Sequence, residues 1–277
     1  MSETLPALTD WGATKQTLHY YAKGVGVIPH GVAKVQTDLA HPKWWHISLK
    51  MGAAGLTTEK MALPDGGEFW LALNGSNHEV VLETSKGDKQ TFSMTQGKTS
   101  TEFGNQLVDA VEALGVKGEF KRDEFENGEP REYDQTKAET WWQAIQVINA
   151  TMSKHHDNIS GEIGPVQLWP HGFDTAFEWF GTRKVSYEGA EHPSQLNFGF
   201  SPGEPSHPEP YFYSNPWPFE EEKLTAVELP HEAKWHVGDW QGSIYEYSAL
   251  VGDPEASDKL FEYFAKVYEA AAPTLTV

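Results

Sequence analysis

Two tight turns constrain the fold of this chain more than any other feature. The strand-like segments Phe69–Leu73 and Glu79–Thr84 are apolar or alternating, and the turn Gly75–Asn77 lies between them. A second turn, Lys86–Asp88, follows directly. Strands joined by so few residues pair antiparallel, because a parallel pair needs a crossover of about a dozen residues or more. The turns therefore predict an antiparallel meander.

Helical patterns occur at the start, in the middle and at the end of the chain. The second pattern starts with Thr99 and Glu102 at the spacing of a capping box, and the fourth starts with Asp253 as cap and Pro254 at the first helical position. The four expected helices cover Thr9–Gly24, Thr99–Gly115, Asp134–His156 and Asp253–Ala272.

Further strand-like segments lie on both sides of the third helical pattern. They are Trp45–Met51, Val166–Trp169, Phe173–Phe180, Gln195–Phe200, Tyr211–Ser214 and Ser243–Leu250. Phe173–Phe180 also fits a helical period, so a helix is an alternative there. The order of elements predicts an α+β fold with largely antiparallel sheets and about four main helices, at the N-terminus, in the middle and at the C-terminus.

The polar stretch 118–134 decides how the chain divides into domains. We expect residues 1–277 to form a single α+β domain in which this stretch is a long surface loop. The alternative is two lobes, 1–117 and 135–277, which this loop joins.

Composition limits the classes of partner and the cellular location. The chain has 21 Lys and Arg against 40 Asp and Glu, which gives a net charge of −19. Such a surface repels nucleic acid and anionic membranes, so a small polar molecule, neutral or cationic, is the expected partner. No apolar run is long enough to span a membrane, and the first residues lack the charged and apolar regions typical of a signal peptide, so we expect a cytoplasmic protein. Cysteine is absent, which excludes disulfides and thiol chemistry.

The segment Trp169–Asp174 holds the first group of candidate functional side chains. His171 lies between Pro170 and Gly172, in a turn that can direct the imidazole into a cleft. If a strand follows, Asp174 and Glu178 share one of its faces. Two carboxylates near a histidine can bind a divalent metal or perform acid–base catalysis.

The segment Asn197–Trp217 holds the second group. Six prolines lie between positions 202 and 218, and each fixes a backbone angle, so this connection is stiff. A stiff loop suits the wall of a preformed site, and the alternative is a loop that only covers the core. Its candidate side chains are Glu204, His207, Glu209, Tyr211, Tyr213 and Trp217.

With these segments the chain resembles a bacterial family of uncharacterised proteins, classed as a domain of unknown function. The resemblance implies one α+β protein of about this length, and it implies no activity. The matching segments, in chain order, are Thr17–Tyr21, Trp44–Leu49, Gly55–Thr58, Trp169–Asp174, Asn197–Gly203 and Pro208–Tyr213.

Two functions remain open from the sequence. The first is an enzyme with the catalytic residues His171, Asp174, Glu209 and Tyr213. Its substrate would be bound by His46, Trp45, Trp169, Asn197, Tyr211 and Trp217. No cofactor is certain, although a divalent metal held by His171, Asp174 and Glu209 is one version of this hypothesis. The second is a non-catalytic binding protein that uses the aromatic, proline-rich loop as its recognition surface. A third interpretation is that these residues only stabilise the fold.

Overall fold

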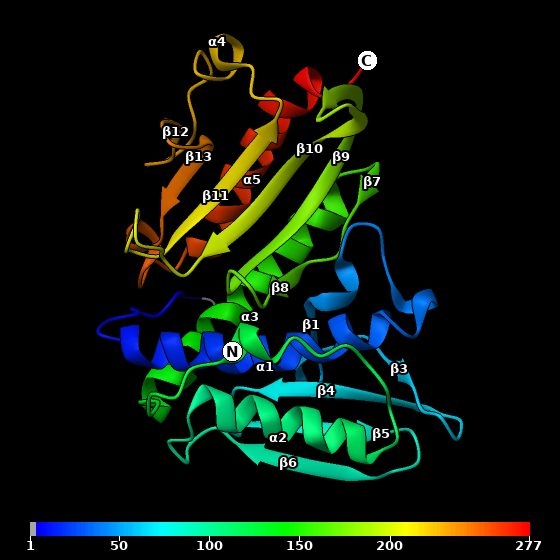
Figure 1. The fold of residues 1–277 in the computed structure, drawn as a ribbon. Coiled ribbons are helices and arrows are strands. Elements are labelled where there is room, and N and C mark those ends of the chain that lie inside the picture. The colour runs from blue at the N-terminus through cyan, green and yellow to red at the C-terminus, as the bar shows by residue number, and fades with distance from the viewer. Residues whose placement is uncertain (1–3) are drawn as a thin grey trace. The chain divides into compact units, whose positions relative to one another are not determined.

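The computed structural model describes residues 4–277, and the strands that pair within each of its two units run antiparallel. These residues form two units, each of which combines helices with a sheet (Figure 1). The N-terminal unit comprises Leu8–Trp142 and Gln167–Phe173, and the C-terminal unit comprises residues 4–7, Gln143–Val166 and Asp174–Val277. The predicted α+β class is confirmed.

The N-terminal unit contains the predicted meander. In its sheet the strands follow the order β8-β1-β2-β4-β5-β6, and β3 pairs with β4. The strands are β1 (Leu49–Gly52), β2 (Gly55–Thr57), β3 (Met61–Ala62), β4 (Glu68–Asn74), β5 (Glu79–Thr84), β6 (Lys89–Ser93) and β8 (Gln167–Trp169). The helices are α1 (Gly12–Ala33), α2 (Ser100–Ala113) and the 3-10 turns Thr37–Leu39, Trp45–Ile47 and Arg122–Phe125.

Helix α1 is longer than its sequence pattern predicts. Gly24 was the expected end, but the helix continues through Pro29 to Ala33. Val25, Ile28 and Val32 are buried along this extension, and their burial outweighs the poor helix propensity of glycine and proline. The expected Thr9-Asp10 cap is also wrong: Trp11 occupies the cap position, and no side chain caps the helix.

Helix α2 begins with the predicted capping box. The Thr99 hydroxyl accepts from the Glu102 amide at 3.1 Å, and the Glu102 carboxylate accepts from the Thr99 amide at 2.9 Å. We expect Thr99→Ala to lower the free energy of unfolding by about 1 kcal/mol, because the Glu102 amide at the helix start loses its acceptor. Thr99→Ser keeps the hydroxyl and should unfold in urea close to the wild type. Equal stability of Thr99→Ala and Thr99→Ser would contradict the assignment.

The C-terminal unit carries the longer strands. Helix α3 (Gln135–Asn158) begins in the N-terminal unit and continues into this one. The strand order of the sheet is β12-β13-β11-β10-β9, and β7 pairs with β9. The strands are β7 (Glu162–Ile163), β9 (Asp174–Tyr187), β10 (Ala190–Ser201), β11 (Tyr211–Trp217), β12 (Lys234–Val237) and β13 (Gln241–Glu246). The remaining helices are α4 (Glu221–Leu224), α5 (Ala256–Ala271) and the 3-10 turns Tyr247–Leu250 and Ala272–Thr274.

Helices α3 and α5 cover one face of this sheet (Figure 1). Phe177 of β9 and Phe198 of β10 stack with ring centroids 5.1 Å apart, and the Phe264 ring of α5 lies 5.5 Å from Phe198. His155 of α3 is 1% exposed among the same rings. The core of the unit therefore lies on the helix side of the sheet.

The structure also decides three further predictions of local secondary structure. The predicted strand Trp45–Met51 is wrong in its first half, where Trp45–Ile47 forms a 3-10 turn before β1. Phe173–Phe180 is a strand rather than a helix, since β9 starts at Asp174. Asp253 accepts from the Glu255 amide at 2.8 Å, but α5 begins only at Ala256, so Asp253 caps the preceding turn.

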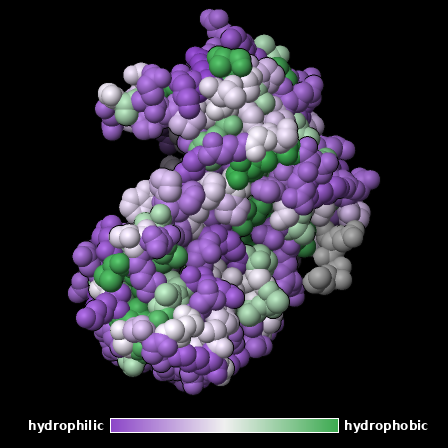
Figure 2. Space-filling model, turned by 90° about the vertical axis from the view of Figure 1, so that its right-hand side faces the viewer, coloured by the Kyte–Doolittle hydropathy of each residue, from purple (hydrophilic) through white to green (hydrophobic). Residues whose placement is uncertain are grey.

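Hydrophilic residues dominate the face drawn in Figure 2, with hydrophobic residues in short stretches between them. Within residues 4–277, no helix has the length and apolar character needed to cross a bilayer.

Candidate functional site

The face of the C-terminal sheet opposite α3 and α5 collects polar side chains from three neighbouring strands. The register pairs Asn197 of β10 with Glu178 of β9 and with Asn215 of β11. Two residues further along β10, Gly199 pairs with Tyr213 of β11. Since side chains alternate along a strand, these positions point to the same face. We call this set of residues, together with Asp174, Ser201 and Tyr211, the polar sheet face.

A hydrogen bond between β11 and β9 crosses this face. The Tyr213 hydroxyl donates to the Asp174 carboxylate at 2.6 Å, and Gly199 lies on the strand between them. A Cβ atom on Gly199 would lie 2.2 Å from Cζ of Tyr213. The tyrosine ring therefore lies against the backbone of β10, which only a residue without a side chain permits.

Burial and charge keep the Tyr213 phenol protonated. Its pKa is raised well above 10, first because the ring is buried and next because the Asp174 carboxylate disfavours a phenolate. Burial also raises the pKa of Tyr211. Both hydroxyls therefore serve as hydrogen-bond donors at neutral pH, and neither is suited to act as a general base.

A second polar cluster lies where β11 begins. The Tyr211 hydroxyl donates to Glu204 at 3.0 Å, and the His207 ring lies 4.4 Å from the Tyr211 ring. Nε2 of His207 lies 3.0 Å from the Glu246 carboxylate of β13. The stiff loop predicted from its prolines thus holds Glu204 and His207 against the end of the sheet.

Two amide oxygens on the polar sheet face lack partners. In the part of the chain that the structure describes, Oδ1 of Asn197 and Oδ1 of Asn215 are buried and accept no hydrogen bond. The two residues face each other directly across β10 and β11. An unpaired buried acceptor costs about 1–3 kcal/mol, so this pair is a candidate for binding a donor group.

The predicted site residues are distributed over both units. Asp174, Asn197, Tyr211 and Tyr213 belong to the polar sheet face, as the register shows. Trp217 ends β11, where its ring lies edge-on to Tyr187 and His192. Glu209 is exposed in the loop before β11, and the described residues form no hydrogen bond or ion pair with its side chain.

The other predicted residues belong to the N-terminal unit. Trp169 ends β8, and its ring lies 5.8 Å from that of His171 in the following turn. The His171 carbonyl accepts from Nε2 of His19 at 2.9 Å, and burial lowers the pKa of His19 to about 4. Trp45 and His46 lie in the 3-10 turn before β1, not in the strand expected for them.

The geometry offers no support for the metal hypothesis. Among residues 4–277, no group of three or more His, Asp or Glu side chains gathers as a metal-binding cluster. His171 lies in the N-terminal unit, whereas Asp174 and Glu209 lie in the C-terminal unit.

Sequence reasoning missed Asn215 and Glu246. Asn215 follows Tyr213 by two positions, so the alternation Tyr211, Tyr213, Asn215 could have placed it on the same face. The predicted strand stopped at Ser214, one residue too early. Glu246 carries no comparable signal, because only the pairing of β13 with β11 brings it opposite Tyr211.

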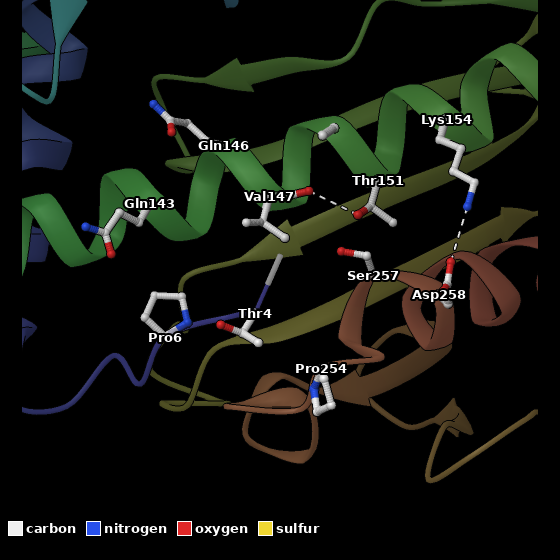
Figure 3. A pocket seen from close by; sticks show the side chains of 11 residues that line it. Thr4, Pro6, Gln143, Gln146, Val147, Thr151, Lys154, Pro254, Ser257 and Asp258 are labelled. Atoms are coloured by element: carbon white, nitrogen blue, oxygen red, sulfur yellow. Dashed lines mark hydrogen bonds and ion pairs between the residues drawn. The ribbon is translucent and has the colours of Figure 1, made fainter. Parts of the chain in front are cut away.

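A separate cavity of about 760 Å³ lies within the C-terminal unit, between α3 and the start of α5 (Figure 3). An ion pair between Lys154 and Asp258, 3.3 Å apart, lies at one end, and Gln143 of α3 lies at the other. Thr151 lines the middle, but its hydroxyl donates to the Val147 carbonyl of its own helix. None of the predicted site residues reaches this cavity.

Comparison with known proteins gives one match. The sequence model of a family of unknown function (DUF5996) matches residues 4–276. No curated protein and no solved structure matches the chain. The family description supplies no activity, so the residues of the polar sheet face must carry the functional argument.

Proposed function

Since the chain belongs to this family of unknown function, DUF5996, we infer its function from the site, and we propose that the polar sheet face binds a small organic cation. The ligand class is an amine or guanidine with an apolar part. The observation that carries the proposal is the pair of buried, unpaired amide oxygens of Asn197 and Asn215. An N–H donor placed across β10 and β11 would satisfy both after a rotation of the two amide groups, whose terminal torsions are soft.

Charge favours a cation over a neutral donor. Asp174 and Glu178 lie on the polar sheet face, and Glu204 and Glu246 lie at its end. The imidazole of His207, at the end of the face, is already paired with Glu246. A cation near several carboxylates gains electrostatic energy that a neutral isostere does not.

Aromatic rings supply the apolar contacts that such a ligand needs. Tyr211 and Tyr213 lie with ring centroids 6.1 Å apart, and Trp240 stacks beside Tyr211 at 6.5 Å. Ring faces attract organic cations, and carboxylates next to rings are a common arrangement in their binding sites. The Tyr213 phenol, held by Asp174, fixes one side of this site and supplies no base for catalysis, so binding is better supported than turnover.

Butylguanidinium and its neutral isostere butylurea test the proposal by titration calorimetry. We expect butylguanidinium alone to bind, because only it carries the charge. Asn197→Leu should weaken binding at least about fivefold, since it removes one acceptor worth roughly 1 kcal/mol. The control Asn158→Leu, at the exposed end of α3, should bind like the wild type.

Equal binding of the two isosteres, or no binding of either, would overturn the proposal. So would an Asn197→Leu variant that unfolds like the wild type and binds butylguanidinium with unchanged affinity. Asn215→Asp provides an independent check, because an added carboxylate should tighten binding of the cation by about tenfold.

A further inference from the structure

A second cavity, of about 310 Å³, lies in the N-terminal unit between the end of α1 and the 3-10 turn Trp45–Ile47. His30 and Lys34 line it from α1, and His41, Trp44 and His46 line it from the following connection. None of these residues belongs to the polar sheet face. The volume is at the lower end of the range of about 300–1,000 Å³ for small-molecule sites.

Trp44 is held in an unusual conformation at this cavity. Its backbone is left-handed, with φ of 62°, and its side chain is 50% exposed. Such a conformation costs about 1 kcal/mol or more for a bulky residue, and strain of this kind often marks ligand sites. The His46 ring stacks at 5.8 Å and the His30 ring lies edge-on at 5.6 Å, which fixes the exposed indole in place.

Two imidazoles have defined tautomers here. Nδ1 of His46 accepts from the backbone amide of His41 at 3.0 Å, and Nδ1 of His41 accepts from the amide of Lys43 at 3.2 Å. Each neutral ring therefore carries its proton on Nε2. Neither Nε2 atom has a hydrogen-bond partner among residues 4–277, so the cavity wall contains two available N–H donors.

The residues that line this cavity include one lysine and no carboxylate, in contrast to the acidic composition of the whole chain. The Lys34 ammonium lies 5.7 Å from the Trp44 ring centroid, and Lys43 lies at the same distance from Trp45. Lys50 and Lys121 also lower the pKa values of the histidines, although Lys50 is paired with Glu59 and Lys121 lies 3.8 Å from Glu124. The Glu124 carboxylate also lies 4.0 Å from His30.

From these contacts we propose that the cavity binds a small aromatic carboxylate. The ligand ring stacks against the exposed indole of Trp44. Its carboxylate accepts hydrogen bonds from the Nε2 atoms of His41 and His46 and lies near the Lys34 ammonium. A flat ring with one anionic group matches the three features of the cavity: an exposed aromatic face, unpaired N–H donors and the ammonium group of Lys34.

Benzoate and the uncharged benzamide separate charge recognition from stacking. In titration calorimetry we expect benzoate to bind and benzamide to bind at least about tenfold more weakly. Lys34→Met should weaken benzoate binding about fivefold or more. The matched control is Lys60→Met, because Lys60 also lies over an indole, that of Trp70 at 5.2 Å, and should not affect binding.

Trp44→Gly separates a ligand-binding role from a structural one. Glycine adopts the left-handed conformation without strain, so the variant should unfold at or above the wild-type temperature and lose at least about tenfold in benzoate affinity. Binding should also tighten from about pH 8 to about pH 6, because a bound anion favours the protonated form of His30, whose pKa is lowered by burial and nearby lysines. His46 stays neutral, because its Nδ1 accepts from the His41 amide.

Glu124 raises the pKa of His30, whereas Lys121 and Lys34 lower it. The bound anion must overcome this lowering. Benzamide binding as tight as benzoate binding would overturn the proposal. It would also be overturned by no detectable benzoate binding, by equal effects of Lys34→Met and Lys60→Met, or by a Trp44→Gly variant that retains wild-type affinity.

Discussion

His155→Phe is expected to make the protein more stable and less sensitive to acid. His155 is fully buried in α3 among the rings of the C-terminal core, and both of its ring nitrogens are buried without a hydrogen-bond partner in the described part of the chain. The rings within 6.2 Å are Phe177, Phe198, Phe261, Phe264 and Tyr268. Phenylalanine keeps the ring contacts and removes a polar group worth about 1–3 kcal/mol of desolvation.

The sign of the acid effect follows from linkage. Burial, and then the neighbouring His156, lower the pKa of His155 from 6.5 to about 4. Below about pH 6.5 the unfolded state therefore binds a proton that the folded state does not, so acidification favours unfolding until about pH 4. Between about pH 7.5 and pH 5 this single group removes about 2 kcal/mol of stability.

Urea unfolding at the two pH values, followed by circular dichroism, measures this difference directly. The wild type should lose about 2 kcal/mol more than His155→Phe on acidification, because the other buried histidines are present in both proteins. His156→Gln serves as control, since this neighbour is partly exposed and paired with Asp157. An equal loss of stability in the wild type and His155→Phe would show that His155 is not a buried neutral base.

Local signals in the sequence were sufficient to predict most of the fold. The turn Gly75–Asn77 predicted the pairing of β4 with β5, and the box of Thr99 and Glu102 predicted the start of α2. Both features depend on interactions between residues only a few positions apart, so a short stretch of sequence is enough to predict them.

Features that depend on distant partners were not predicted. Gly24 would stop an isolated helix, but in α1 it allows close packing, since a Cβ there would lie 3.3 Å from Cα of Gly104 in α2. Trp45 and His46 follow an apolar pattern that suits a strand, yet Trp44 enters the left-handed region and directs the chain into a 3-10 turn. In both places tertiary packing overrides local propensity.

The sequence pointed to several residues of the candidate site, but it did not show which of them lie close together. The alternation in β9 and β11 placed Asp174 and Tyr213 correctly on their strands, and the pairing through β10 brings them to 2.6 Å. That pairing was not available from the sequence, because strand order depends on contacts between segments tens of residues apart. For the same reason the division of the predicted residues between two units was not foreseen.

Gly199→Ala is the second substitution for which we expect a large loss of stability, because it should disrupt the polar sheet face. The added methyl group would lie 2.2 Å from Cζ and 2.5 Å from the hydroxyl oxygen of Tyr213. Because the β10 backbone is fixed on both sides by ladder hydrogen bonds, the tyrosine ring must move, and its bond to Asp174 breaks. We expect the free energy of unfolding to fall by about 2–3 kcal/mol, with loss of butylguanidinium binding.

A double-mutant cycle isolates this contact. Tyr213→Ala alone removes the ring and the hydrogen bond, but once the ring is absent, Gly199→Ala no longer meets an obstacle. The two changes together should therefore destabilise the protein by about 2 kcal/mol less than the sum of the single changes. Gly128→Ala, where a Cβ would have no atom within 4 Å, should shift stability by no more than about 0.5 kcal/mol. Additive effects of Gly199→Ala and Tyr213→Ala would mean that the glycine is required for the strand itself, and that the Tyr213 ring does not depend on it to reach Asp174.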